Sequence, residues 1–153
     1  MIAYSTVGVE MPPVDQPQVT AWVQQVATRY GRKAGDITFI FVSDEEILRI
    51  NREYIHHDYY TDHIGFDYSA GHILSGDIFV GVETVASNAA LVGETYWREL
   101  HRVIIHGVLH LCGLKDKTPA ERQQMEAAEN DALALATWLE ASEQGIKQGK
   151  KAE

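Results

Sequence analysis

Two histidines inside an apolar run have the spacing that lets one metal ion be held on a helix. His106 and His110 lie four residues apart in a run that begins at Leu100. On an α-helix, residues i and i+4 lie on one face about one turn apart, so both imidazoles can reach the same ion. We expect Gly113 to end this helix and the chain then to present Asp116, whose carboxylate can coordinate from a third direction. Two histidines and one carboxylate leave a position for water, which is typical of catalytic zinc sites.

The neighbouring residues limit this interpretation. By spacing alone, the two histidines could equally be core or surface residues that form hydrogen bonds within the protein and bind no metal. Cys112 could be a fourth ligand, but it faces roughly the opposite side of the helix from His110, so we interpret it as a small buried hydrophobe. His101 lies off the shared face and is left out of the predicted site. Gly107 stands where a His-Glu-x-x-His metallopeptidase carries its general base, which argues against proteolysis.

The wider pattern, His-Gly-x-Leu-His-Leu-x-Gly over residues 106–113, resembles the signature of the YbeY family, bacterial endoribonucleases and rRNA maturation factors. Residues 51–66 resemble the family's Asn-x-x-Tyr-Arg-x-x-Asp-x-Pro-Thr-Asp-Val-Leu-Ser-Phe segment, and residues 76–78 (Gly-Asp-Ile) match a third block. The resemblance spans about residues 36–130. Two positions depart from the family: Asp116 replaces a third histidine, and Ile55 replaces an arginine suited to phosphate.

This resemblance implies an α/β fold in which a small mixed β-sheet packs against several helices, with a zincin-like metal site on a long helix and the following turn. It implies a metal-dependent endoribonuclease that acts on single-stranded RNA in ribosomal RNA maturation, at the 3′ end of 16S RNA. We expect His106, His110 and Asp116 to hold one zinc ion, although the same donors suit iron(II). Asp62 is our candidate for a catalytic carboxylate near the open position.

Two other functions stay open at this point. One is a ribosome-assembly factor in which the metal only fixes the fold around residues 106–116, and the other is a metallopeptidase. The expected partner is ribosomal RNA or the ribosomal subunit, with no membrane and no DNA. Cleavage of RNA or of peptide by the purified chain separates the three functions.

The composition is that of an ordinary globular protein, with 45% hydrophobic and 23% charged residues. The lone cysteine excludes an internal disulfide and fits a reducing cytoplasm. We find no signal peptide and no apolar run of the roughly 20 residues that cross a bilayer. We expect one domain over residues 1–144 and a polar, flexible tail over 145–153.

The net charge of −9 is unusual for a protein that acts on RNA, because contacts to phosphates supply much of the affinity. A local strip of cations beside the histidine motif could receive the RNA backbone, although these residues could also be solvated helix charges. The candidates are Arg98, Arg102, Lys115, Lys117 and Arg122.

Hydrophobic periodicity predicts the elements that would position these groups. Strands are expected at 2–8, 37–42, 63–68 and 72–80, and helices at 16–31, 43–54, 82–92, 96–112 and 118–142, with Gly31 and Gly35 bounding the end of the first helix. Ser43 and Thr118 begin capping-box patterns. His56, His57 and Asp58 fall in a loop, where we favour loop polarity or a substrate contact over a second metal site.

Overall fold

The computed structural model describes residues 1–55 and 61–140. In chain order the elements are β1 (Ile2–Val7), α1 (Gln16–Arg29), β2 (Lys33–Val42), α2 (Asp44–Ile50), a π-helical segment η1 (Asn51–Ile55), β3 (His63–Asp67), β4 (Ile73–Gly81), α3 (Val82–Val92), α4 (Tyr96–Leu111) and α5 (Pro119–Leu135). The predicted helices 82–92 and 96–112 and the predicted strands 2–8, 63–68 and 72–80 are therefore confirmed to within one residue at each end.

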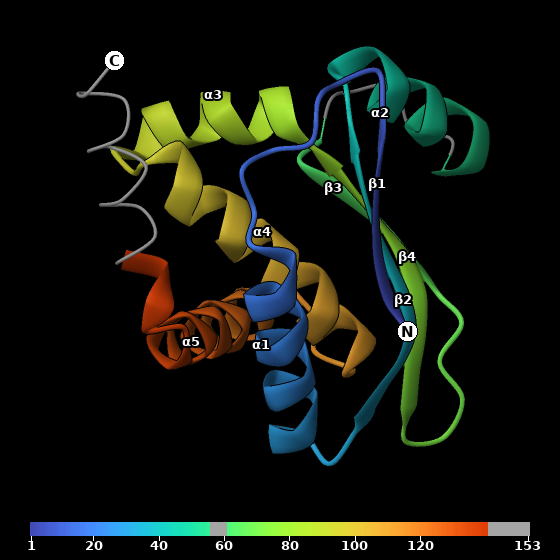
Figure 1. Cartoon of the computed structure of the whole chain (residues 1–153), viewed down its shortest axis with the longest axis vertical. Coiled ribbons are helices and arrows are strands. Elements are labelled where there is room, and N and C mark those ends of the chain that lie inside the picture. Colours follow the sequence, from blue (N-terminus) through green and yellow to red (C-terminus); the bar gives the residue numbers. More distant parts are fainter. Residues whose placement is uncertain (56–60, 141–153) are drawn as a thin grey trace.

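The strands form one mixed sheet in the order β1-β2-β4-β3. β1, β2 and β4 are parallel, whereas β3 pairs antiparallel with β4 and lies at the edge. Figure 1 shows α1, α4 and α5 together on one side of the sheet. Successive residues of a strand point to opposite faces, so Phe39 and Phe41 join the core under these helices, while Ile40 and Val42 join a second core with α2. This arrangement confirms the expected α/β fold.

Helix α4 lies very close to strand β4. A Cβ atom added at Gly107 of α4 would lie 2.8 Å from Cγ2 of Ile78 on β4, and one added at Gly76 of β4 would lie 3.1 Å from Cδ2 of Leu111 on α4. Such distances leave no room for a larger side chain, so two glycines allow this approach. The close packing brings the middle of α4 next to the beginning of β3.

The helix ends predicted at Ser43, Thr118 and Gly113 are confirmed. The Ser43 side chain accepts a hydrogen bond from the backbone N–H of Glu46, and Thr118 and Glu121 form a complete capping box. Gly113 has a positive φ of 102°, the conformation expected of a glycine that ends a helix.

Two predicted boundaries are wrong. The strand expected at 37–42 begins at Lys33, so Gly35 lies inside β2 rather than at the end of the first helix, and the pairing with β4 shifts register between Ala34 and Ile37. Helix α5 ends at Leu135 rather than near 142, because Ala136 leaves the helical conformation with ψ at 64°. Ser142 and the predicted tail 145–153 lie outside the described residues, and the division into a domain and a tail stays a prediction. No helix in the described part of the chain is long and apolar enough to cross a membrane.

His101 lies in the hydrophobic core rather than beside the other histidines of α4. Its side chain is 0% exposed, and its ring centroid is 4.4 Å from that of Trp97. Nδ1 lies 2.7 Å from the carbonyl oxygen of Trp97 and donates to it, whereas Nε2 has no hydrogen-bond partner among the described residues. Burial lowers the pKa of His101 to about 4, against a smaller opposite effect of the hydrogen bond to Trp97.

This lowered pKa predicts a stability that falls in acid. The unfolded chain takes up a proton at its ordinary pKa of 6.5, whereas the folded chain keeps His101 neutral until about pH 4. The contribution is therefore fully present above pH 6.5 and lost as the pH falls toward 4. Relative to His101→Phe, the parent should lose about 3 kcal/mol of unfolding free energy between neutral pH and about pH 4. Urea unfolding of both chains measures this, and a pH-independent difference would contradict it.

Candidate metal centre

The two motif histidines meet on one face of α4, as their spacing predicts. Their Nε2 atoms lie 3.0 Å apart. Thr95 caps the beginning of this helix through its side chain, and the opposite face carries the buried residues Leu100, Ile104 and Leu111. Burial of that apolar face fixes the rotation of the helix, and this rotation holds both imidazoles on the side facing β3.

The turn after α4 brings in the predicted carboxylate. Oδ2 of Asp116 lies 3.1 Å from Nε2 of His110 and 3.2 Å from Nε2 of His106. The turn begins at Gly113 and is held by a backbone hydrogen bond from Leu114 to Leu109. The structure therefore places His106, His110 and Asp116 around one point.

A third histidine, which the sequence analysis did not consider, lies against the same point. His63 is the first residue of β3, and its ligand atom and those of His106 and His110 all lie within 4.8 Å of one another. The ring centroid of His63 is 4.5 Å from that of His106 and 6.0 Å from that of His110. One signal was available: His63 stands where the family segment has valine. Nothing in the sequence showed that this end of the strand meets α4.

Each of the three imidazoles is oriented through its Nδ1 atom. Nδ1 of His106 lies 2.6 Å from Oε2 of Glu129, Nδ1 of His110 lies 3.0 Å from the carbonyl oxygen of Leu114, and Nδ1 of His63 lies 2.7 Å from Oδ1 of Asp62. A ring that donates from Nδ1 presents an unprotonated Nε2. Metal-binding histidines in proteins almost always have such an outer partner.

The carboxylates of the site stay ionised to low pH. Burial raises the pKa of Glu129, but hydrogen bonds from His106 and Arg102 outweigh it and bring this pKa below its usual range. Burial opposes ionisation of Asp62 and Asp116 in the same way. The hydrogen bond with His63 brings the pKa of Asp62 below its usual range, and the charge and hydrogen bond of His110 do the same for Asp116. The site is therefore rich in negative charge near neutral pH, which suits a cation.

The two helix histidines are shifted in opposite directions. Burial lowers the pKa of His106, but the hydrogen bond and charge of Glu129 raise it above its usual value. Burial and the charge of His106 lower the pKa of His110. A proton on one ring therefore disfavours a proton on the other, as expected for two coupled groups 3.0 Å apart.

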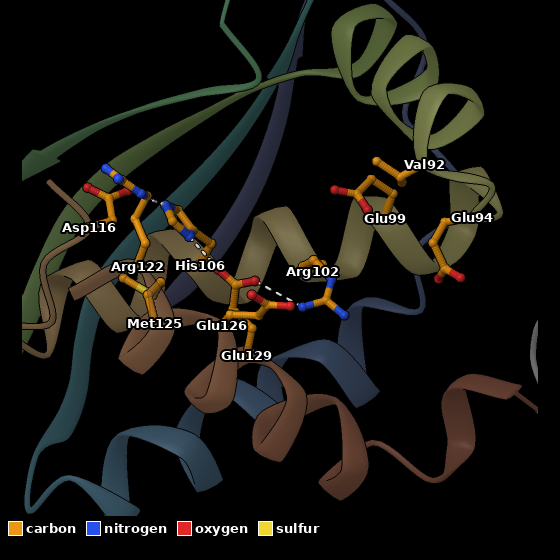
Figure 2. Close-up of a pocket in the computed structure, with 10 residues that line it drawn as sticks. All are labelled: Val92, Glu94, Glu99, Arg102, His106, Asp116, Arg122, Met125, Glu126 and Glu129. Carbon is orange, nitrogen blue, oxygen red and sulfur yellow. Dashed lines mark hydrogen bonds and ion pairs between the residues drawn. The ribbon is translucent and has the colours of Figure 1, made fainter. Parts of the chain in front are cut away.

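A hollow of about 480 Å³ opens from this cluster between α4 and α5. Figure 2 shows it running from Asp116, His106 and Arg122 at one end, past Arg102 and Glu129, to Glu94 and Glu99 at the other. Burial and then neighbouring carboxylates raise the pKa of Glu99. Glu99 was not among the predicted site residues, although it lies seven residues, or about two turns, before His106 on the same helix face.

The remaining candidates fall in different places. Asp62 contacts His63 rather than an open position. Cys112 is buried, and burial raises the pKa of its thiol to about 11, in keeping with the predicted hydrophobic role. Ile55 ends η1 and is partly exposed. His56, His57 and Asp58 lie outside the described residues.

The predicted cationic strip is partly neutralised. Arg98 pairs with Glu94 at 3.2 Å, and Arg102 pairs with Glu129 at 3.0 Å. Lys115 and Lys117 are exposed on the turn that carries Asp116, and Arg122 lines the hollow. The cations near the histidine cluster are therefore fewer than the sequence suggested.

The fold and the cluster define an α/β protein with a histidine and carboxylate constellation built like a metal centre. The profile of the family described as Endoribonuclease YbeY matches residues 9–136. A relative named Endoribonuclease YbeY from Phocaeicola vulgatus is 56% identical over 135 residues, covering 88% of this chain and 98% of the relative. One of the same name from Bacteroides thetaiotaomicron is 54% identical over 134 residues, covering 88% and 98%. The chain therefore belongs to the YbeY family, which confirms the resemblance noted in its motifs.

A solved structure supports the fold independently. The solution structure of TM1509 from Thermotoga maritima is similar to this chain with a TM-score of 0.59 and 23% identity, covering 94% of this chain and 93% of that one. At this identity the likeness concerns the fold, which is the mixed α/β arrangement described above.

The orientation of His106 generates a prediction for Glu129. Loss of an outer partner typically lowers metal affinity by 10- to 100-fold. Glu129→Gln should therefore weaken zinc binding by about 10-fold or more, because the carboxylate that orients His106 is replaced by a neutral amide. Glu126→Gln is the matched control, since Glu126 lines the same hollow on the same helix. Titration against a chromophoric chelator measures both affinities, and equal values for the two variants would contradict the role of Glu129.

Proposed function

We propose that this chain is a zinc-dependent endoribonuclease that cleaves single-stranded RNA in ribosomal RNA maturation, at the 3′ end of 16S RNA. One observation carries the proposal: His106, His110 and Asp116 converge on one point in a chain whose relatives are named Endoribonuclease YbeY. Ribosomal RNA or the ribosomal subunit is the proposed partner, and the cytoplasm the proposed location. We expect no DNA substrate.

The donor set fits zinc. Imidazole nitrogen and carboxylate oxygen are ordinary zinc ligands, and Nδ1 of each helix histidine is already held by an outer partner. The same donors also suit iron(II), as expected from the replacement of a histidine by Asp116. Zinc is the metal that we propose, with His106, His110 and Asp116 among its ligands.

When bound, such an ion supplies an activated water near neutral pH and polarises a phosphoryl oxygen. The chain's own residues position the reactants. Glu129 and the carbonyl oxygen of Leu114 orient the two helix imidazoles. Arg122, which lines the hollow beside His106 and Asp116, is placed to hold a phosphate of the RNA backbone.

Asp62 acts in this proposal as a positioning residue rather than as a proton acceptor. It holds Nδ1 of His63 at 2.7 Å, and its pKa is brought below the usual range mainly by that partner against the effect of burial. A general base is most effective when its pKa lies near the working pH.

The packing of Gly107 weighs against a metallopeptidase. The position that would carry the glutamate base faces Ile78 of β4, where even a Cβ atom would lie at 2.8 Å. A glutamate there would require the Ile78 side chain to move. A purely structural ion is disfavoured by the hollow that reaches His106 and Asp116, because structural zinc sites are closed.

His106→Ala and His110→Ala test the metal site and the activity together. The parent should hold about one zinc per chain, and either variant should hold little, since each loses one of the two imidazoles that α4 supplies to the site. RNA cleavage should be lost with the metal. His72→Ala removes an exposed histidine elsewhere and should change neither. Elemental analysis and cleavage of a single-stranded RNA measure these outcomes.

Two results would overturn parts of the proposal. Undiminished zinc in both variants would place the ligands elsewhere in the chain. A parent that binds zinc at this site but cleaves no RNA, with folding intact, would favour the assembly-factor alternative.

The remaining cations give a separate test of RNA binding. Changing Lys115 and Lys117 to glutamate should weaken binding of single-stranded RNA by about 10-fold at low salt, because both lie on the turn beside Asp116. Changing Lys150 and Lys151 alters the net charge equally and should have a smaller effect. Fluorescence anisotropy over a range of salt measures both, and equal losses would show that only net charge matters.

A further inference from the structure

Two departures from the family pattern meet at one point of this structure. Asp116 stands where the family motif carries its third histidine, and His63 stands where the family segment has valine after Thr-Asp. The imidazole that is missing from the turn after α4 is thus matched by one on β3. In the structure both positions face His106 and His110.

The orientation of His63 follows from its place in the edge strand. Side chains alternate along a strand, and Ile64 points into the second core with α2. His63 therefore points to the face that α4 covers, where its ring lies 4.5 Å from that of His106 between centroids. The close packing at Gly107 and Gly76 is what makes this contact possible.

The ring of His63 is oriented by a partner at Nδ1, as are the rings of His106 and His110. Asp62 holds its Nδ1 at 2.7 Å, which leaves Nε2 for the shared point. The side chains of His63 and Asp62 are only 23% and 28% exposed, so this is not a freely solvated surface pair. The ligand atoms of the three imidazoles lie within 4.8 Å of one another, and the Asp116 carboxylate lies against two of them, His106 and His110, so all four side chains surround the region where a cation would bind.

We propose that His63 is a direct metal ligand in this protein and replaces the family's third histidine, with Asp62 as its outer partner. The ion is then held by the Nε2 atoms of His63, His106 and His110 and by Asp116. The inference rests on the proposed metal site but not on RNA cleavage. Four protein donors fill a tetrahedral shell, so substrate or water must enter as a fifth ligand, which zinc accepts, or displace one donor.

His63→Val tests the assignment because it installs the family residue and suits a strand. We expect zinc affinity to fall by more than about 10-fold, since loss of even an outer partner costs that much. His72→Val is the matched control at an exposed histidine. The double variant His63→Val with Asp116→His restores three imidazoles and should recover most of the lost affinity. Chelator competition gives the affinities, and circular dichroism checks the fold.

X-ray absorption at the zinc edge counts imidazole ligands without relying on any variant. The parent should show three imidazoles, His63→Val two, and the double variant three again. A parent with two imidazoles overturns the assignment, even if His63→Val fails to fold. A His63→Val variant that binds zinc as tightly as the His72→Val control would also overturn the assignment.

The two failures can be distinguished. If His106→Ala and His110→Ala lose zinc while His63→Val keeps it, the proposed metal site stands and His63 is not a ligand. If the parent binds no zinc, both the site and this assignment fall.

Discussion

The close packing of α4 against β4 is the constraint on which the site depends. Gly107 and Gly76 remove the side chains that would hold the helix away from the sheet. The helix can then carry His106 and His110 up to the edge strand, where His63 begins β3. The same approach puts the Ile78 side chain against position 107, so a packing requirement that helps assemble the histidine cluster also favours glycine where a metallopeptidase carries its catalytic base.

The charges around the cluster explain how an acidic chain can contain a site for an anionic polymer. Asp62, Asp116 and Glu129 are kept ionised by their histidine and arginine partners. This local negative charge favours a divalent cation, and the cation would in turn attract phosphate. Arg98 and Arg102 are paired with glutamates, so the positive charge available to RNA lies on Lys115, Lys117 and Arg122, close to the proposed ion.

Local sequence signals predicted the elements and the near neighbours in the chain. The i, i+4 spacing, the helix end at Gly113 and the inward Asp116 needed only helix geometry and turn chemistry. His63 and Glu129 could not be placed in this way, because their contacts with His106 join β3 and α5 to α4 across the fold. The end of α5 at Leu135 could not be predicted from the local sequence either, because residues 119–142 contain no glycine and no proline after Pro119. Near this end of the helix, the Ala132 carbonyl accepts a hydrogen bond from Nε1–H of Trp22, a residue far away in the sequence.

The most direct test of the central claim is anomalous diffraction at the zinc edge from crystals grown with zinc. Our account predicts one strong peak enclosed by Nε2 of His63, Nε2 of His106, Nε2 of His110 and the carboxylate of Asp116. A peak that lies instead among the glutamates of the hollow, or an empty cluster in a crystal that holds zinc elsewhere, would contradict it.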